Sequence, residues 1–208
     1  MGLTRMQTDH WAGKDLKIIQ SYWDSPPARA RSQWFVEQIK DYKFNSVFEI
    51  GYFSGRNLKY ITEAFPKASI GGLEVNKRAV KFAQEKLPRA KLLHMDLHDM
   101  HNINEKYDLV FTSGVLIHVP PDELMNVAKK CLDLSNRYVV HMESLGKNEV
   151  VAGPKTLNPT YKISDQLQWA PELAAIYKFI GFDVKIIKLP ENCKTNGASE
   201  LLVVDKQK

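Results

Sequence analysis

Short apolar runs alternate with amphipathic runs through the middle of this chain. The run Val47-Phe48-Glu49-Ile50 stops at Gly51, and a helix-like pattern begins soon after it. This pattern predicts a buried strand that turns sharply into a helix. A second apolar strand is predicted to close at Glu74, and a helix follows from Asn76, a plausible N-cap, to Leu87.

The same alternation continues downstream. Strands are predicted at residues 91–95, 107–113 and 137–142, and a helix runs from Pro120 to about Leu132. Strands that alternate with helices at this spacing imply right-handed crossovers and a parallel sheet.

The C-terminal part departs from this alternation. A helix is predicted from Pro171 to Ile180, ended by Gly181, and two strands follow at 182–189 and 199–205. The loop between these strands, which contains Asn196-Gly197, is too short for a parallel crossover. We therefore expect the sheet to finish in an antiparallel hairpin.

The turn after the first strand indicates the chemistry. Gly51 and Gly55 stand where the backbone bends tightly or approaches a ligand, and Glu49 comes just before them. Glu74 follows about 20 residues later, where a βαβ unit presents an acid to ribose hydroxyls. The chain is therefore predicted to bind an adenosine-bearing cofactor at the carboxyl edge of the sheet.

The loop itself narrows the choice of cofactor. A dinucleotide site usually reads G-x-G-x-x-G, but Phe53 replaces the middle glycine and Leu58 the last one. Pyrophosphate would have poor access past Phe53. S-adenosylmethionine carries no phosphate, and Glu49 offers a carboxylate to its ammonium and sulfonium groups. A nicotinamide oxidoreductase shares the βαβ unit but is disfavoured by Phe53 and by the terminal hairpin.

The loop resembles motif I of the class I, Rossmann-like methyltransferases, E/D-x-G-x-x-x-G, and the resemblance extends from Phe44 to Lys206. It implies an α/β fold with a seven-stranded, mostly parallel sheet, a C-terminal antiparallel hairpin and helices on both faces. It also implies S-adenosyl-L-methionine as the cofactor. The residues that the resemblance assigns to cofactor binding are Glu49, Gly51, Gly55, Glu74, Val75, Asp96, Leu97, Ser113, Gly114 and Leu116. Tyr52 and Asn57, in and just after the same loop, are further candidates for cofactor binding.

Three segments look similar to the methylases associated with pseudaminic acid biosynthesis. These are residues 11–13, 51–58 and 112–119. This similarity implies a small polar acceptor such as a sugar derivative, methylated on oxygen or nitrogen. The stretch 144–170 reproduces that family poorly, so the identity of the acceptor stays open.

Three side chains are candidates for catalysis. Methyl transfer is an in-line displacement, and a hydroxyl or ammonium acceptor must also lose a proton, for which histidine is suited at neutral pH. His118 follows the fourth strand, near the expected methyl position, although it could instead cap or pack the next helix. His141 and Glu143 end the fifth strand and are expected to face the cleft, or else to form a polar pair in water.

Segments outside the sheet are predicted to cover the site. Residues 1–43 form an N-terminal helical extension, ahead of a methyltransferase domain at 44–208, and Trp11 and Tyr22 are candidates for a lid over the cofactor. The insertion at 144–170, with Pro154, Pro159 and Tyr161, is expected to act with residues 8–30 as a lid on the acceptor side. The acids and histidines of 96–101 are interpreted as a polar loop, with no metal site.

Composition adds limits to this picture. The chain has 208 residues, which suits one α/β domain, and 44% apolar and 25% charged residues, as in soluble globular proteins. No apolar run is long enough for a membrane span and no signal-peptide core is present. The two cysteines have no metal-like spacing, so we expect a cytoplasmic protein.

The net charge of +5 comes from lysines spread along the chain, so nucleic acid is an unlikely partner. RNA methylation remains an alternative, as does a non-catalytic protein that binds S-adenosylmethionine. The oligomeric state stays open.

Overall fold

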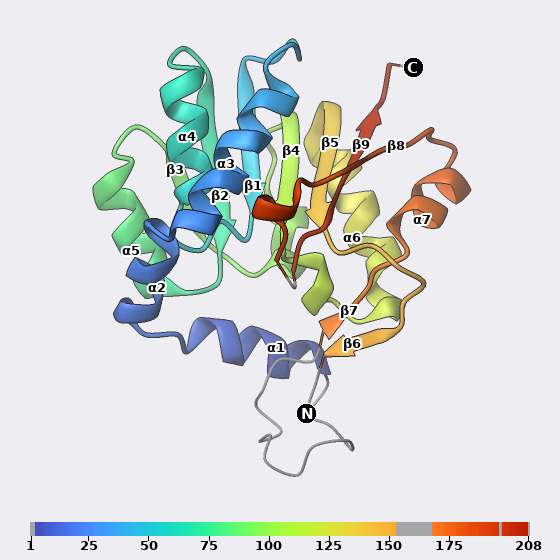
Figure 1. The fold of residues 1–208 in the computed structure, drawn as a ribbon, viewed down its shortest axis with the longest axis horizontal. Helices are drawn as coiled ribbons and strands as arrows, with labels where there is room; N and C mark the ends of the chain where they lie inside the picture. The colour runs from blue at the N-terminus through green and yellow to red at the C-terminus, as the bar shows by residue number, and fades with distance from the viewer. Residues whose placement is uncertain (1–2, 153–167, 196, 208) are drawn as a thin grey trace.

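The computed structural model describes residues 3–152, 168–195 and 197–207. Its centre is a seven-stranded sheet in the order β3-β2-β1-β4-β5-β9-β8 (Figure 1). The strands of this sheet are β1 (Ser46–Ile50), β2 (Ser69–Glu74), β3 (Lys91–His94), β4 (Tyr107–Ser113), β5 (Ser135–Glu143), β8 (Lys185–Lys188) and β9 (Glu200–Asp205).

The first five strands pair in parallel, and β9 lies antiparallel to both β5 and β8. The predicted parallel sheet with a C-terminal hairpin is therefore confirmed. From β1 the chain first extends the sheet toward β3 and then returns to place β4 on the other side of β1. Such a reversal of strand order opens a crevice at the carboxyl ends of β1 and β4, which is where open α/β sheets bind ligands.

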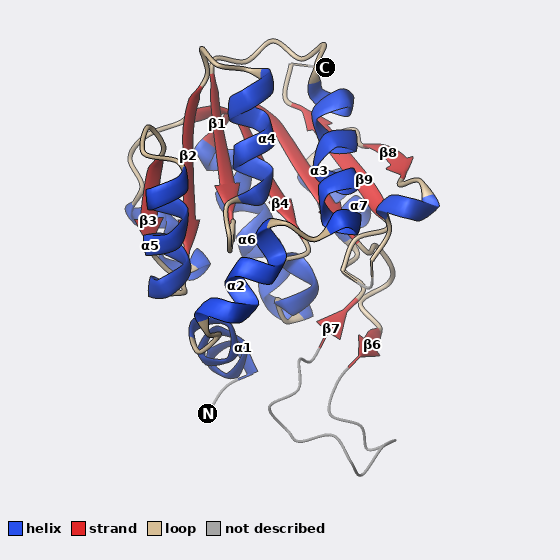
Figure 2. Ribbon diagram, turned by 60° about the vertical axis from the view of Figure 1, so that its left-hand side comes forward, coloured by secondary structure: helices blue, strands red, loops and turns tan. Residues whose placement is uncertain are grey.

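Helices cover both faces of the sheet (Figure 2). Side chains alternate along the strands, so that Leu109 and Phe111 of β4 face one core while Val110 faces the other. The first core is covered by α3 (Pro26–Ile39), α4 (Arg56–Ala64) and α5 (Lys77–Lys86), and the second by α6 (Pro121–Leu134), α7 (Leu173–Ile180) and the 3₁₀ helix η1 (Leu97–Asn102).

Local signals set several of these boundaries. The side chain of Asn76 accepts hydrogen bonds from the backbone N–H groups of Arg78 and Ala79 and so caps α5. Gly181 ends α7 in the left-handed conformation, with a φ of +104°. Both ends were predicted from the sequence.

The N-terminal helices α1 (Leu3–Ala12) and α2 (Leu16–Trp23) lie across the carboxyl edge of the parallel strands (Figures 1 and 2). A separate small apolar cluster of Ile19, Phe53, Ala79 and Phe82 holds α2 against α5 and the loop after β1. By contrast, α3 packs its side chains into the main core. Within the predicted extension at 1–43, therefore, α3 belongs to the domain core, whereas α1 and α2 lie outside it except for Trp23, which packs against the first core.

The insertion predicted at 144–170 is described at its two ends. There β6 (Val150–Ala152) and β7 (Gln168–Trp169) form a small antiparallel pair. Residues 153–167, with Pro154, Pro159 and Tyr161, lie outside the described residues, as does Asn196.

Two further 3₁₀ turns are η2 (Leu116–His118) and η3 (Glu191–Cys193). In the described parts of the chain, no helix has the length and apolar character needed to cross a membrane.

Candidate functional site

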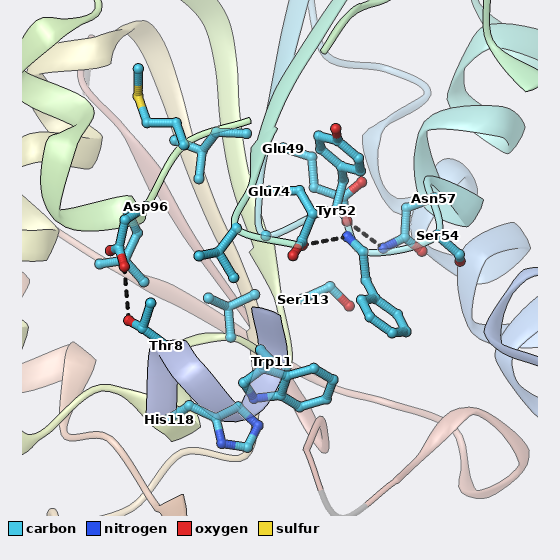
Figure 3. A pocket seen from close by; sticks show the side chains of 18 of the residues that line it. Thr8, Trp11, Glu49, Tyr52, Ser54, Asn57, Glu74, Asp96, Ser113 and His118 are labelled. Atoms are coloured by element: carbon cyan, nitrogen blue, oxygen red, sulfur yellow. Dashed lines mark hydrogen bonds between the residues drawn. The ribbon is translucent and has the colours of Figure 1, made fainter. Parts of the chain in front are cut away.

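A cavity opens at the carboxyl edge of the sheet, between the ends of β1, β2 and β4 and the N-terminal helices (Figure 3). It lies at the reversal of strand order. Most of the residues predicted to bind the cofactor, together with one predicted catalytic residue, line it: Trp11, Tyr22, Glu49, Gly51, Tyr52, Asn57, Glu74, Val75, Asp96, Leu97, Ser113, Gly114 and His118.

The loop after β1 is shaped by its backbone conformation. Gly51 has a φ of +69°, and a Cβ atom there would lie 2.7 Å from the Cγ2 atom of Val115. Any side chain would therefore collide with the loop after β4. Phe53 also has a positive φ, of +46°, and its backbone N–H donates to Glu74 Oε2 at 2.9 Å. Gly55, predicted to bind the cofactor, instead caps α4 and does not line the cavity.

Glu49 brings a buried, incompletely paired carboxylate to the cavity. Its Oε1 atom accepts a hydrogen bond from Asn57 Nδ2 at 2.7 Å, whereas Oε2 is buried without a partner among the described residues. Burial raises the pKa of Glu49 to about 7. A buried acceptor left in this state is suited to a ligand that brings a cation or a hydrogen-bond donor.

Arg31 supplies the opposite charge and was not predicted. It comes from α3, is buried, and lines the same cavity. Its guanidinium donates from Nη1 to Thr195 Oγ1 at 2.8 Å, but its Nε has no partner among the described residues. Burial lowers the pKa of Arg31. Its spacing from Phe35 and Ile39, two core residues of α3, is the sequence signal that could have revealed an arginine on the buried face of the helix.

Two more acids extend the acidic edge past β2 and β3. Glu74 accepts from the backbone N–H groups of Phe53 and Asn76, at 2.9 and 2.8 Å, and burial raises its pKa to about 7. Asp96 begins η1 and accepts from Thr8 Oγ1 at 2.8 Å. Burial disfavours the ionised form of Asp96, but the hydrogen bonds to its carboxylate favour that form more strongly, and the bond from the His98 side chain contributes most. The pKa of Asp96 is therefore lowered to about 2.

The N-terminal helices close the cavity from the solvent side. The ring of Trp11 packs edge-on against that of His118, with a centroid distance of 5.1 Å (Figure 3). Phe53 packs edge-on against Trp11 at 5.4 Å and against Tyr22 at 5.1 Å. The carbonyl of Trp11 also accepts from Asn76 Nδ2 at 2.8 Å. These contacts lay α1 and α2 directly over the cavity.

Two predicted catalytic side chains lie elsewhere. His141 and Glu143 were expected to face the cleft or water, and both expectations are wrong, because both side chains are fully buried and neither lines the cavity. Thr112 Oγ1 donates to Glu143 Oε1 at 2.7 Å and lies 2.8 Å from His141 Nδ1, and Tyr177 OH lies 2.6 Å from His141 Nε2. Burial lowers the pKa of His141 to about 3, so this histidine is neutral.

The reason for this burial is local. Helix α7 covers the end of β5 and supplies Tyr177, and Glu143 accepts a hydrogen bond from the backbone N–H of Val115 at 3.1 Å. The buried Glu143 carboxylate thus fixes the loop after β4 from the interior. Leu116, expected at the wall beneath the methyl group, is likewise fully buried in the second core and does not line the cavity.

Several residues that line the cavity were not among the predicted site residues. They come mostly from α1, the loop after β1, the start of η1 and the two ends of η2: Gln7, Thr8, Arg31, Phe53, Ser54, Arg56, Leu73, Met95, His98, Val115 and Val119. Apart from the helical spacing of Arg31, no local pattern marks them. They reach the site through contacts between distant segments.

Comparisons with known proteins agree with this geometry. A family model described as a methyltransferase domain matches residues 47–137. A protein of Invertebrate iridescent virus 6 with the provisional name methyltransferase 235L is 29% identical over 79 residues, which cover 38% of this chain and 29% of the viral protein.

Solved structures match over nearly the whole chain. Magnesium protoporphyrin IX methyltransferase from Synechocystis PCC 6803, with bound S-adenosylhomocysteine, has a TM-score of 0.72 at 16% identity and covers 98% of this chain and 99% of its own. The plantazolicin methyltransferase BpumL, also with S-adenosylhomocysteine, has a TM-score of 0.66 at 15% identity, with coverages of 98% and 95%. The N-terminal domain of EvdMO1, in the presence of S-adenosylhomocysteine and D-fucose, has a TM-score of 0.59 at 18% identity, with coverages of 88% and 83%.

At these identities the structural matches show the fold, which is that of the Rossmann-like methyltransferases. Together with the domain match and the viral relative, they support an S-adenosylmethionine-dependent methyltransferase.

Proposed function

We propose that this chain, which has the fold of the S-adenosylmethionine-dependent methyltransferases, transfers a methyl group to an oxygen or nitrogen of a small polar metabolite. One observation carries the cofactor half of this proposal. Glu49 Oε2 and Arg31 Nε are buried atoms of opposite charge, without partners among the described residues, and their side chains line one cavity.

The pair fits the amino-acid end of the cofactor. A methionine moiety carries an ammonium and a carboxylate on one carbon atom, and each needs an oppositely charged partner when it leaves water. Glu49 would hold the ammonium and Arg31 the carboxylate. Gly51, which also lines the cavity, has a positive φ and leaves no room for a side chain beside Val115.

The nucleoside end fits the neighbouring acids. Glu74 ends β2 and would accept from the ribose hydroxyls in addition to the backbone groups that it already holds, with Val75 against the adenine. Asp96, which follows β3, would accept from the adenine amino group, beside Leu97. We assign Tyr52, Asn57, Ser113 and Gly114 to the walls of the same site.

The bound cofactor would supply an electrophilic methyl group on a sulfonium. The chain's own contribution is to hold the acceptor in line with that methyl group and to exclude water, which Trp11, Tyr22 and Phe53 favour by covering the cavity. We propose His118, which lines the cavity beside Trp11, as the base that removes the proton from the acceptor.

The proposed class of methyl acceptor has less support than the proposed cofactor. The resemblance of three segments to pseudaminic acid-associated methylases, and a structural neighbour studied with D-fucose, favour a sugar derivative. Other neighbours are named for a porphyrin and for plantazolicin, so the acceptor must be found by experiment. A lid formed by residues 8–30 and 144–170, the domain limits 1–43 and 44–208, and a cytoplasmic location belong to the same proposal.

Calorimetric titration of the purified chain tests the cofactor assignment. We expect micromolar binding of S-adenosylhomocysteine and no binding of NADH, which serves as the control ligand. A screen of sugar metabolites with S-adenosylmethionine would then identify the acceptor by mass increase of the product.

Each other result points to a different conclusion. NADH binding tighter than S-adenosylhomocysteine would make the protein a nicotinamide enzyme. Binding of S-adenosylhomocysteine without turnover of small acceptors or RNA would indicate a non-catalytic binding protein, and turnover of RNA alone would replace the small acceptor.

A further inference from the structure

His98 joins two carboxylates from different elements at one edge of the cavity. Its Nδ1 atom lies 2.6 Å from Asp96 Oδ1, and its Nε2 atom lies 2.6 Å from Glu123 Oε2. Asp96 is the N-cap of η1, whereas Glu123 stands in the first turn of α6. Asp96 and His98 both line the cavity, so the bridge is part of its wall.

The geometry defines the protonation of the ring. Both ring nitrogens face carboxylate oxygens, which accept hydrogen bonds, so both must donate, and only the imidazolium can do this. The hydrogen bond to Asp96 raises the pKa of His98, against the effect of burial. Among the described residues, the other polar groups that contact His98 are Lys130 Nζ, 2.5 Å from the His98 carbonyl, and His101 Nδ1, 3.2 Å from the same oxygen.

The bridge leaves the two oxygens of Asp96 unequal. Oδ1 accepts from both the backbone N–H of His98, at 2.9 Å, and the ring Nδ1. Oδ2 accepts, among the described residues, only from Thr8 Oγ1 at 2.8 Å (Figure 3). A carboxylate oxygen can accept two hydrogen bonds, so Oδ2 is the atom with room for a further donor.

We propose that His98 is a positioning residue for cofactor specificity: as an imidazolium bridge from Asp96 to Glu123, it fixes the Asp96 carboxylate so that Oδ2 reads the 6-amino group of adenine. This inference rests on the proposed function, because it assumes that the adenine reaches Asp96. It adds a residue whose role is selectivity for a 6-aminopurine. Thr8 of α1 then shares the same oxygen, which couples the covering helix to the base.

Binding of two nucleosides to matched variants tests the proposal. S-inosylhomocysteine differs from S-adenosylhomocysteine by an oxygen in place of the 6-amino group, so it removes the donor and turns an acceptor toward Asp96. We expect the wild type to prefer S-adenosylhomocysteine at least tenfold in calorimetry at pH 7. His98→Asn keeps a donor near the Nδ1 position and should retain this preference within threefold.

His98→Gln places its donor near the Nε2 position, and His98→Ala has none, so both should bind the two nucleosides equally within threefold. The control is His101→Ala, which removes an exposed histidine of the same 3₁₀ helix and should leave the preference unchanged. A role as a simple cross-link between η1 and α6 would not separate asparagine from glutamine in this way.

A preference that persists in His98→Ala, or that is lost in His98→Asn as well, overturns the inference while leaving the proposed function standing. If the wild type binds no S-adenosylhomocysteine, the proposed function fails and this inference fails with it. One measurement needs no variant. The ¹⁵N chemical shifts of the His98 ring in the full chain should show both nitrogens protonated at pH 7, and a neutral ring would contradict the bridge.

Discussion

Buried titratable groups behave differently on the two sides of the strand-order reversal. On the side of β1, β2 and β3, Glu49, Glu74 and Asp96 stand at strand ends and line the cavity. On the side of β5, His141 and Glu143 also stand at a strand end, yet both lie in the interior. A place at the carboxyl edge of a sheet is therefore not sufficient to put a side chain in the site.

The difference lies in whether these side chains line the cavity, because the chain supplies hydrogen-bonding partners on both sides. Next to β5, the chain itself supplies Thr112, Tyr177 and the backbone of Val115. Glu49 and Glu143 each keep one oxygen, Oε2, without a partner among the described residues, but only Glu49 lines the cavity, where a ligand can supply that partner. The first group of side chains fixes the architecture, and the second is prepared for binding.

Of the changes considered, removal of Glu49 should have the largest effect on cofactor binding. We expect Glu49→Ala to weaken S-adenosylhomocysteine binding by about 100-fold or more, or about 3 kcal/mol, because a buried charged partner of the ligand is lost. Calorimetry measures the effect. Glu37→Ala, an exposed carboxylate of α3 paired with Lys40, is the control and should change nothing. Equal affinities in wild type and Glu49→Ala would show that the methionine site is misassigned.

Glu143 should affect the pH dependence of stability. Burial raises its folded pKa to about 7, above the unfolded value of 4.5, so the native state binds the extra proton between these limits. Glu143 alone should therefore lower the free energy of unfolding by up to about 3 kcal/mol as pH rises through this window, and Glu49 and Glu74, whose pKa values are also raised to about 7, should add to the fall. Glu143→Gln should reduce the fall by the share of Glu143 without abolishing it. Urea unfolding at pH 5 and pH 8 measures it. Parallel pH profiles of the wild type and Glu143→Gln would contradict a Glu143 pKa that burial has raised.

Cofactor affinity should follow the ionisation of Glu49. An ammonium group prefers the ionised carboxylate, whose pKa is raised to about 7, so binding below that pH must release a proton. Affinity for S-adenosylhomocysteine should rise about 15-fold from pH 5.5 to pH 7, reach about 30-fold by pH 8, and then level off. Titrations in two buffers with different ionisation enthalpies count the released proton. A flat profile in Glu49→Gln would assign the effect, and a flat profile in the wild type would rule it out.

Tyr177→Phe should have the smallest effect, and it tests whether the buried side chains next to β5 are separate from the cavity. The hydroxyl lies 2.6 Å from His141 Nε2, and its loss leaves that buried nitrogen unsatisfied. We expect the free energy of unfolding to fall by about 1–3 kcal/mol. Binding of S-adenosylhomocysteine should stay within threefold of the wild type, since neither residue lines the cavity. A large loss of binding at unchanged stability would place this network in the site.

The sequence by itself determined the fold. Strand β4 occupies the residues predicted for it, Asn76 caps α5, and the C-terminal hairpin pairs antiparallel. Each of these follows from local rules: the period of apolar residues, the side chains that cap a helix, and the chain length available for a crossover. The places of Glu49 and Glu74 in the cavity follow from the same rules, because parallel strands bring their carboxyl ends to one edge.

Only the tertiary structure decided which groups meet across the chain. Thr8 reaches Asp96 over 88 residues, and Arg31 reaches Thr195 over 164. The same holds for the burial of His141 beneath α7, since a strand pattern gives the face of a side chain but not what covers that face. Hydrogen bonds between distant segments, and the burial of a side chain, depend on distances that no local sequence period encodes. The fold could therefore be predicted from the sequence, but which polar side chains are buried in the interior and which line the cavity could not.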